Sequence, residues 1–272
     1  MFSICMATYN EFDNLFWTIE MIRIYGGVPD VQFVVCNNDP NSRQGKAITK
    51  YLARIPNAKE VFCDVVGTAA PRNKAIASAD YEWKLCMDCH VALLPGVAKR
   101  LAEWVKSDEA EKLKLDLFHG PLKYTHAESY ATHFSEKWNA AMLGQWQTDN
   151  DMLKDDTPKP ITNMGMGLFL VKDWLGFEEE NRGFGGEEGV IQKKYFKHGR
   201  NVWLLPFLKW NHKFERYEVP HSVRNKDKFR NYMIGYVKND LDPTECKKHF
   251  GGILSKAEYQ SVIDKVQSIF PK

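Results

Sequence analysis

Strands and helices alternate at short intervals through the first ninety residues of the chain. The apolar run from Phe2 to Ala7 is typical of a buried strand, and apolar residues then recur at helical spacing until Gly26 and Gly27. Segments of the same two kinds follow, with strands expected at 31–36, 60–63 and 81–87 and helices around 48–52 and 72–79. Such alternation predicts an α/β fold with a mostly parallel central sheet, right-handed crossovers and flanking helices.

The second half of the chain is less regular. Strands are expected at Leu115–Gly120, 164–171 and 202–205, and a helix is expected at 190–196, ending at Gly199. The stretch from Pro121 to Pro160 is polar, rich in His, Trp and Asp, and lacks a clean period. We therefore interpret it as an insertion or mobile loop near a functional site.

Composition narrows the class of protein. With 272 residues, of which 44% are hydrophobic and 13% aromatic, the chain can bury a large core. The net charge of +2 does not by itself indicate a nucleic-acid or membrane partner, and neither a run of eighteen apolar residues nor a secretory signal pattern is found. Six cysteines without a dense framework favour reduced thiols, so we expect a cytoplasmic location.

An acid and an imidazole stand two residues apart where the strand at 81–87 ends. Alternate side chains of an extended backbone point to the same side, so Asp88 and His90 can ligate one divalent cation together. The carboxyl ends of parallel strands are also where α/β sheets bind ligands. Because an Asp-x-His pair is common by chance, this pattern alone is weak support for a metal site.

Two adjacent acids, Glu187 and Glu188, follow a pair of glycines and precede the helix expected at 190–196. Glycines let a ligand approach the backbone closely, and the helix macrodipole favours ionised carboxylates at this position. The pair is therefore a candidate for acid–base chemistry. The alternative is that both are ordinary first-turn acids on a solvated helix.

Five separated segments fit one known arrangement: Thr8–Glu11, Gly67–Ala75, Asp88–His90, Gly185–Glu188 and His212–Arg216. Together they resemble the nucleotide-sugar glycosyltransferases of the GT-A fold, typified by the inverting family-two enzymes. The Asp-x-His segment is similar to that of the polypeptide N-acetylgalactosaminyltransferases. The Gly-Gly-Glu-Glu segment resembles their Gly-Gly-Glu-Asn and the Gly-Gly-Glu-Asp of the β-1,4-galactosyltransferases. Order and spacing agree over roughly residues 2 to 216, which makes the combination more specific than any single motif.

The resemblance implies a Rossmann-like GT-A domain that holds a divalent cation and a nucleotide diphosphate. Asp88, His90 and His212 are the implied metal ligands. A cation acting as a Lewis acid stabilises the charge that develops on a departing diphosphate. Imidazole with carboxylate suits Mn²⁺, and Zn²⁺, Fe²⁺ and Co²⁺ are compatible with the same ligand types. Taken alone, His212 reads as a surface histidine of a polar loop.

The donor expected from the resemblance is a UDP-sugar. The class usually carries an Asp at the end of the second strand that contacts uracil or ribose, whereas this chain has Cys36 and Asn37 near that point, so the base stays open. The guanidinium of Arg72 can pair with the diphosphate. The alternative interpretation is that Arg72 points from its helix to water. The residues expected around the donor are Thr8, Tyr9, Asn10, Asn37, Asp39, Arg72 and Asp88.

The resemblance gives the two acids separate roles. In galactosyltransferase-like enzymes the second acid of the pair deprotonates the acceptor hydroxyl, whereas an Asn stands there in the retaining N-acetylgalactosaminyltransferases. Glu188 is acidic, which is compatible with inversion, while the Asp-x-His segment favours the retaining relatives. The stereochemistry therefore stays open. Glu187 is expected to bind the acceptor or the donor sugar.

We expect the catalytic domain to span residues 1–216 and a basic extension of helices and loops to span 217–272. Within the extension, the run Arg224–Tyr232 interleaves cations and aromatic residues as polyanion-binding surfaces do. We favour the simpler interpretation, a solvated helix face with a loop that closes over the donor diphosphate.

The predicted function is metal-dependent transfer of a sugar from a nucleotide diphosphate, most simply a UDP-sugar, to an acceptor hydroxyl. The acceptor is expected to be a glycan, a protein or a small molecule, with a modified DNA base as the minority hypothesis and no membrane partner. The alternative is that the chain is not an enzyme but a non-catalytic relative that only binds a sugar nucleotide or a carbohydrate. Turnover of a nucleotide sugar with added Mn²⁺ separates the two.

Overall fold

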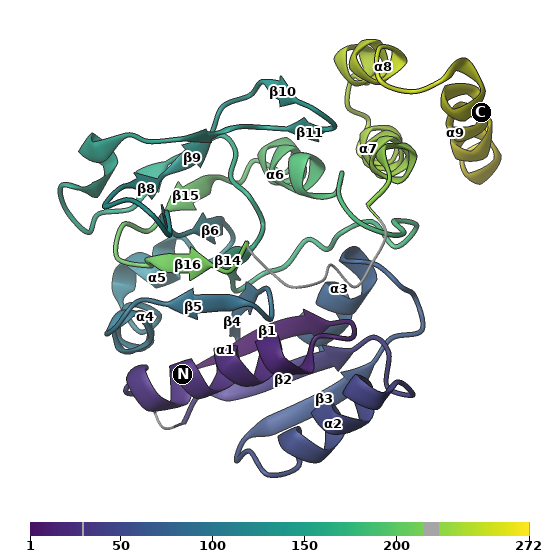
Figure 1. Cartoon of the computed structure of the whole chain (residues 1–272). Coiled ribbons are helices and arrows are strands. Elements are labelled where there is room, and N and C mark those ends of the chain that lie inside the picture. The colour runs from purple at the N-terminus through teal and green to yellow at the C-terminus, as the bar shows by residue number, and fades with distance from the viewer. Residues whose placement is uncertain (29, 215–222, 272) are drawn as a thin grey trace.

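The computed structural model describes residues 1–28, 30–214 and 223–271. Within these residues, eight strands form one central sheet, and the predicted α/β class with a mostly parallel sheet is confirmed (Figure 1). From one edge to the other the order is β13 (Lys159–Pro160), β15 (Val202–Leu204), β6 (Leu117–His119), β14 (Leu168–Val171), β4 (Trp83–Met87), β1 (Phe2–Thr8), β2 (Gln32–Asn37) and β3 (Ala58–Phe62).

Helices cover this sheet. Those before residue 200 are α1 (Phe12–Tyr25), α2 (Arg43–Leu52), α3 (Ala69–Ala77), α4 (Val97–Trp104), α5 (Asp108–Lys112) and α6 (Glu188–Lys197). The helical spacing seen in the sequence places Leu15, Ile19 and Ile22 of α1 in the core, where each is at most 4% exposed. Helix α3 packs against β1 and β2, and α6 packs against β15. Strands β1, β2 and β4 run parallel to one another, so their carboxyl ends lie at the same edge of the sheet, as the sequence predicted.

The stretch from Pro121 to Pro160 differs from the expected loop. It consists mostly of two-residue strands, namely β7 (Leu122–Lys123), β8 (Tyr130–Ala131), β9 (His133–Phe134), β10 (Trp138–Asn139), β11 (Met142–Leu143) and β12 (Trp146–Gln147), followed by the 3₁₀ turn η1 (Asn150–Leu153) and β13. Strand β9 pairs with β12, and β10 pairs with β11. Such short pairings carry no readable period, which is why the sequence suggested an irregular insertion.

A second, four-stranded sheet joins the two halves of the chain. In it β5 (Val91–Leu93), β16 (Trp210–His212), β7 and β8 lie in that order. Strand β16 pairs antiparallel with β5, so that His212 stands opposite Val91. This pairing brings the end of the expected catalytic domain beside the turn that follows β4.

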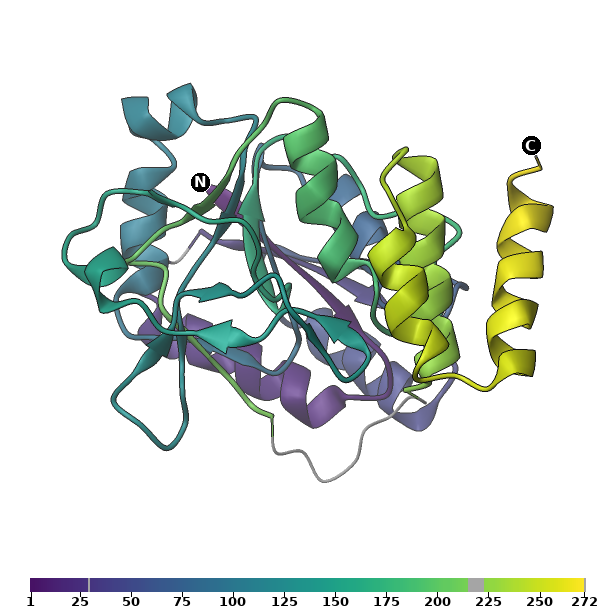
Figure 2. The ribbon, with the colours of Figure 1, turned by 90° about the horizontal axis from the view of Figure 1, so that it is seen from above.

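Residues 225–269 form three helices, α7 (Asn225–Lys238), α8 (Thr244–Gly251) and α9 (Lys256–Ile269). Helix α7 lies beside α6, and α8 and α9 pack on α7 (Figures 1 and 2). Phe229, Tyr232 and Phe250 are fully buried there, in a separate apolar cluster that also contains Leu143. Trp138 stacks on His249, with ring centroids 4.6 Å apart. The extension is thus packed against the 138–143 segment, and the domain boundary proposed at 216 lies outside the described residues.

None of the helices that the structure describes is both long and apolar enough to span a lipid bilayer.

Candidate active site

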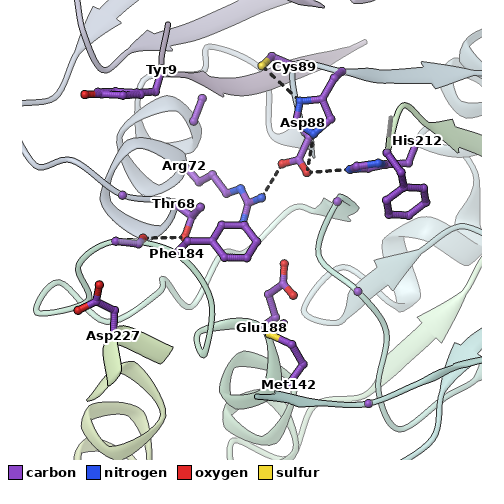
Figure 3. A pocket seen from close by; sticks show the side chains of 18 of the residues that line it. Tyr9, Thr68, Arg72, Asp88, Cys89, Met142, Phe184, Glu188, His212 and Asp227 are labelled. Carbon is purple, nitrogen blue, oxygen red and sulfur yellow. Dashed lines mark hydrogen bonds and ion pairs between the residues drawn. The ribbon is translucent and has the colours of Figure 1, made fainter. Parts of the chain in front are cut away.

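A pocket of about 1030 Å³ lies beyond the carboxyl ends of β1 and β4 (Figure 3). Its walls come from the turn after β1, the start of α3, the turn after β4, the start of α6 and the segment from Phe134 to Trp146. Helix α7 contributes a further wall through Asp227 and Arg230. Segments from both halves of the chain therefore meet at the edge where an α/β sheet is expected to bind its ligand.

Asp88, His90 and His212 converge on one point of this pocket. Asp88 Oδ2 lies 3.6 Å from His90 Nε2 and 3.5 Å from His212 Nε2, and one ligand atom from each of the three residues lies within 4.8 Å of the others. Asp88 follows β4, while the pairing of β5 with β16 and the bond from the Lys213 amide to the His90 carbonyl, at 3.0 Å, fix His212 in place. The structure thus brings together the three ligands that the resemblance implied.

This donor set fits a divalent cation. One carboxylate oxygen and two imidazole nitrogens suit Mn²⁺, Fe²⁺, Co²⁺ or Zn²⁺. Burial alone would raise the pKa of Asp88, but the charge of Arg72 and a hydrogen bond from His212 outweigh it and hold that pKa well below its usual range. Asp88 is therefore ionised, as a metal ligand must be.

Arg72 lies inside the site and does not point to water, since its side chain is 5% exposed. It stands in the first turns of α3, and its Nη2 lies 2.5 Å from Asp88 Oδ1 while its Nη1 lies 3.8 Å from Glu187 Oε1. A second polar contact joins the same elements, because the Thr68 hydroxyl donates to Glu187. The guanidinium therefore connects the cluster of Asp88, His90 and His212, called the metal corner below for its proposed role, to the paired acids.

The loop before α6 takes backbone conformations that favour glycine. Gly183, Gly185 and Gly186 have φ values of 69°, 83° and 94°. Gly183 also forms an isolated bridge with Gly67, where an added Cβ at Gly67 would lie 2.8 Å from the Gly183 carbonyl oxygen. The loop can therefore lie against the start of α3 and place both acids at the pocket.

The two acids of this loop differ in environment. Glu187 is 2% exposed, while Glu188 lines the pocket and points toward the space in front of Asp88 and Arg72 (Figure 3). Burial raises the pKa of Glu188 to about 7, the negative charge of Glu187 adds to this, and Arg72 opposes it. A carboxylate with such a pKa is suited to exchange protons near neutral pH.

Only some of the residues expected around the nucleotide line the pocket. Thr8 and Tyr9 line the pocket, whereas Asn10 is exposed at a left-handed φ of 57°. Asn37 is fully buried and donates to the Gly45 carbonyl and to Glu60. Neither Asn10, Asn37 nor Asp39 is among the described residues that line the pocket. Asn38, the residue directly after β2, lines it instead.

Helix α7 differs from the solvated face that its cations suggested. Lys228 and Arg230 are 9% and 8% exposed. The Lys228 ammonium lies 5.7 Å from the centre of the Phe184 ring, and Arg230 Nη2 donates to the Arg182 carbonyl at 2.8 Å. Two of the four cations in this run are thus turned toward the loop before α6, while Arg224 and Lys226 remain exposed.

Sequence reasoning also missed residues of this pocket. Phe134, Met142, Trp146, Phe184 and Asp227 line the pocket, and none of them was assigned a role from the sequence. Phe134, Met142 and Trp146 come from a stretch of two-residue strands without a readable period. Phe184 and Asp227 lie in the loop before α6 and on α7, and only the fold brings them to the site.

A sequence model of the family described as "Glycosyl transferase family 2" matches residues 3–157, just over half of the chain. A search of curated proteins finds no significant match. Among solved structures, S. aureus TarS 1–349 in complex with UDP-GlcNAc aligns with a TM-score of 0.57 and 14% identity, covering 90% of this chain and 69% of that chain. GalNAc-T7 with UDP, GalNAc and Mn²⁺ aligns with a TM-score of 0.66 and 15% identity, covering 98% of this chain and 54% of that chain. The chain therefore spans about half the length of GalNAc-T7, and these likenesses show the fold.

Proposed function

The chain belongs to glycosyl transferase family 2 and has the GT-A fold, and on this basis we propose that it transfers a sugar from a UDP-sugar to an acceptor hydroxyl with the help of a divalent cation. Support for the donor comes from two structural neighbours, one solved with UDP-GlcNAc and the other with UDP, GalNAc and Mn²⁺. Thr8, Tyr9 and Asn38 are the residues that we assign to the nucleoside, because they line the pocket at the end of β1.

One observation carries the proposal. The Asp88–His90–His212 corner, the buried Arg72 and the carboxylate of Glu188 all lie in one pocket. Metal ligands, a buried guanidinium and a carboxylate whose pKa is raised to about 7 together provide charge stabilisation and a base for inverting sugar transfer from a diphosphate. A module that only binds carbohydrate has no need of this combination.

When bound at Asp88, His90 and His212, a divalent cation would stabilise negative charge on the departing diphosphate. Arg72 keeps Asp88 ionised and keeps a positive charge near the same corner. The acceptor oxygen attacks the anomeric carbon, the bond from that carbon to the diphosphate oxygen breaks, and Glu188 takes the proton of the acceptor hydroxyl. Since an acid occupies the position of the base, we propose inversion at the anomeric carbon.

A screen of UDP-sugars tests the proposal. We expect one or more donors to be hydrolysed slowly in the presence of Mn²⁺, with loss of turnover in chelator and in the folded Asp88→Ala variant. Full activity of the wild type in chelator would refute the metal dependence. Binding of UDP-sugars without any turnover, under every metal tried, would favour the non-catalytic alternative.

The acceptor is proposed to be a hydroxyl of a glycan, a protein or a small molecule. Phe134 and Trp146 lie on the wall formed by the 134–146 segment, with ring centroids 4.2 Å apart, and provide an apolar surface at the pocket. A modified DNA base is less well supported, because two of the four cations in the 224–232 run, Lys228 and Arg230, are buried.

A further inference from the structure

Glu11, the last residue of the turn after β1, contacts the metal corner from behind. Its Oε2 lies 2.9 Å from His90 Nδ1 and 3.1 Å from Cys89 Sγ. Glu11, Cys89 and His90 are 8%, 3% and 7% exposed, so the contact is shielded from bulk water. The opposite side of the same imidazole, Nε2, is the atom that faces Asp88 Oδ2 at 3.6 Å.

The fold holds Glu11 in this position from two sides. Asn10 takes a left-handed φ of 57°, which turns the chain sharply between β1 and α1, and Glu11 then stands at the N-cap of α1. Its side chain makes no capping bond and is directed to His90 instead. Farther along α1, Thr18 Oγ1 donates to the carbonyls of Cys89 and Val91 at 3.0 Å each, which ties the helix to the turn after β4.

The chemistry of these groups fixes where the protons lie. An ionised carboxylate only accepts hydrogen bonds, so the proton between Glu11 and His90 belongs to Nδ1 and the proton between Glu11 and Cys89 belongs to the thiol. The N-terminal end of a helix favours the ionised form of the carboxylate. A neutral imidazole that carries its proton on Nδ1 has its lone pair on Nε2, the atom at the metal corner.

We propose that Glu11 is a positioning residue that holds His90 as the Nδ1–H tautomer, and thereby directs the Nε2 lone pair to the divalent cation and makes it more basic. This inference rests on the metal role in the proposed function. A carboxylate behind a ligand histidine typically changes metal affinity by about 10–100-fold.

Glu11, Cys89 and His90 also form a second group of potential ligands. Distances of 2.9 and 3.1 Å to one carboxylate oxygen are those of hydrogen bonds with protons between the atoms. We therefore assign this group to the support of His90 and not to a second cation.

Mn²⁺ binding to the full chain, measured by calorimetry and electron paramagnetic resonance, tests the inference without turnover. Glu11→Gln keeps the shape and removes the charge, and we expect its Kd for Mn²⁺ to rise by about 10–100-fold. Asp13→Asn is the matched control, because it removes one charge from the exposed side of the same helix turn, and its Kd should equal that of the wild type. Equal Kd values for Glu11→Gln and the wild type overturn the inference and leave the metal site intact. Absence of Mn²⁺ binding in the wild type overturns the metal site and the inference together.

Nitrogen NMR of the metal-free wild type gives a second readout that does not depend on any variant folding. We expect His90 to show a protonated Nδ1 and an unprotonated Nε2 at a pH where it is neutral. A protonated Nε2 in the neutral ring would overturn the inference even if Glu11→Gln weakened Mn²⁺ binding through a general loss of structure.

Discussion

Arg72 Nη2 lies 2.5 Å from Asp88 Oδ1, so a residue of α3 neutralises the carboxylate at the end of β4. The same guanidinium lies 3.8 Å from Glu187. Three charged side chains from three separate segments are thus held together with little access to water, and the site depends on all of them remaining paired.

Arg72→Met should lower the free energy of unfolding by about 3–5 kcal/mol, because it leaves two poorly solvated carboxylates without their cation. Urea denaturation at neutral pH measures the change. Arg54→Met is the control, since Arg54 is exposed in the turn that follows α2, and it should unfold like the wild type. A loss below about 1 kcal/mol, the value typical of an exposed ion pair, would mean that water already screens the charges of Arg72 and its partners.

Glu188→Gln should reduce the rate of sugar transfer by about 10²–10⁴-fold, because the amide cannot take the proton of the acceptor hydroxyl. In the wild type the rate should rise with pH through about 7, as Glu188 loses its proton, and this rise should be absent in the variant. Exposed Glu179→Gln serves as the control and should keep both rate and pH profile. A product of retained anomeric configuration, seen by NMR before mutarotation, would contradict the role of the base.

The pKa of Glu188 also predicts how stability depends on pH. The folded state binds this proton more tightly than the unfolded state, since its folded pKa is about 7 against an ordinary value of 4.5. Its contribution is therefore fully present below the ordinary value and is lost as the pH rises through about 7. Denaturation of the wild type and of Glu188→Gln at several pH values should show a smaller decline in the variant over this window. Parallel curves would argue against the raised pKa.

His212→Ala should weaken Mn²⁺ binding by more than about tenfold, because losing a direct metal ligand should lower the affinity at least as much as losing a residue that only supports a ligand. Sugar-nucleotide turnover should fall with it and recover partly at high Mn²⁺. Exposed His198→Ala keeps the metal corner and should behave like the wild type. Unchanged affinity in His212→Ala would leave Asp88 and His90 as the only supported ligands.

Asn231→Ala should loosen the loop before α6. Asn231 is 1% exposed, accepts from the Arg182 amide and donates to the carbonyls of Arg182 and Gly185. Leaving these groups unpaired should cost about 1–3 kcal/mol and lower kcat more than it changes KM. The exposed Asn225→Ala, on the same helix, is the comparison. An unaltered kcat with reduced stability would show that the loop keeps its shape without this residue.

Local patterns predicted the first half of the molecule well, because each strand and helix there is long enough to show a period. The Asp88–His90 pair was visible for the same reason, since its two ligands share one strand end. Asn37 shows the limit of such reasoning. The side chain of Asn37, the last residue of β2, donates to Glu60, while the next residue, Asn38, lines the pocket.

Long-range packing explains what the sequence did not reveal. Lys228 and Arg230 look solvated in the sequence, yet α7 lies against the loop before α6, and that contact buries them. Trp138 stacks on a side chain of α8, and the Leu143 amide donates to a hydroxyl of α7. Both partners lie more than eighty residues later in the chain. No local period can report a partner at such a distance.

The three hydrogen bonds between Asn231 and the loop before α6 set an order of events during synthesis. The sheet, the metal corner and the loop before α6 all precede Asn231 in the chain, and N-terminal parts fold first as a protein leaves the ribosome. A nascent chain that has emerged as far as residue 214 carries every proposed ligand and both acids, yet the loop that bears those acids still lacks its anchor. The competent enzyme is therefore completed late, when α7 emerges and docks.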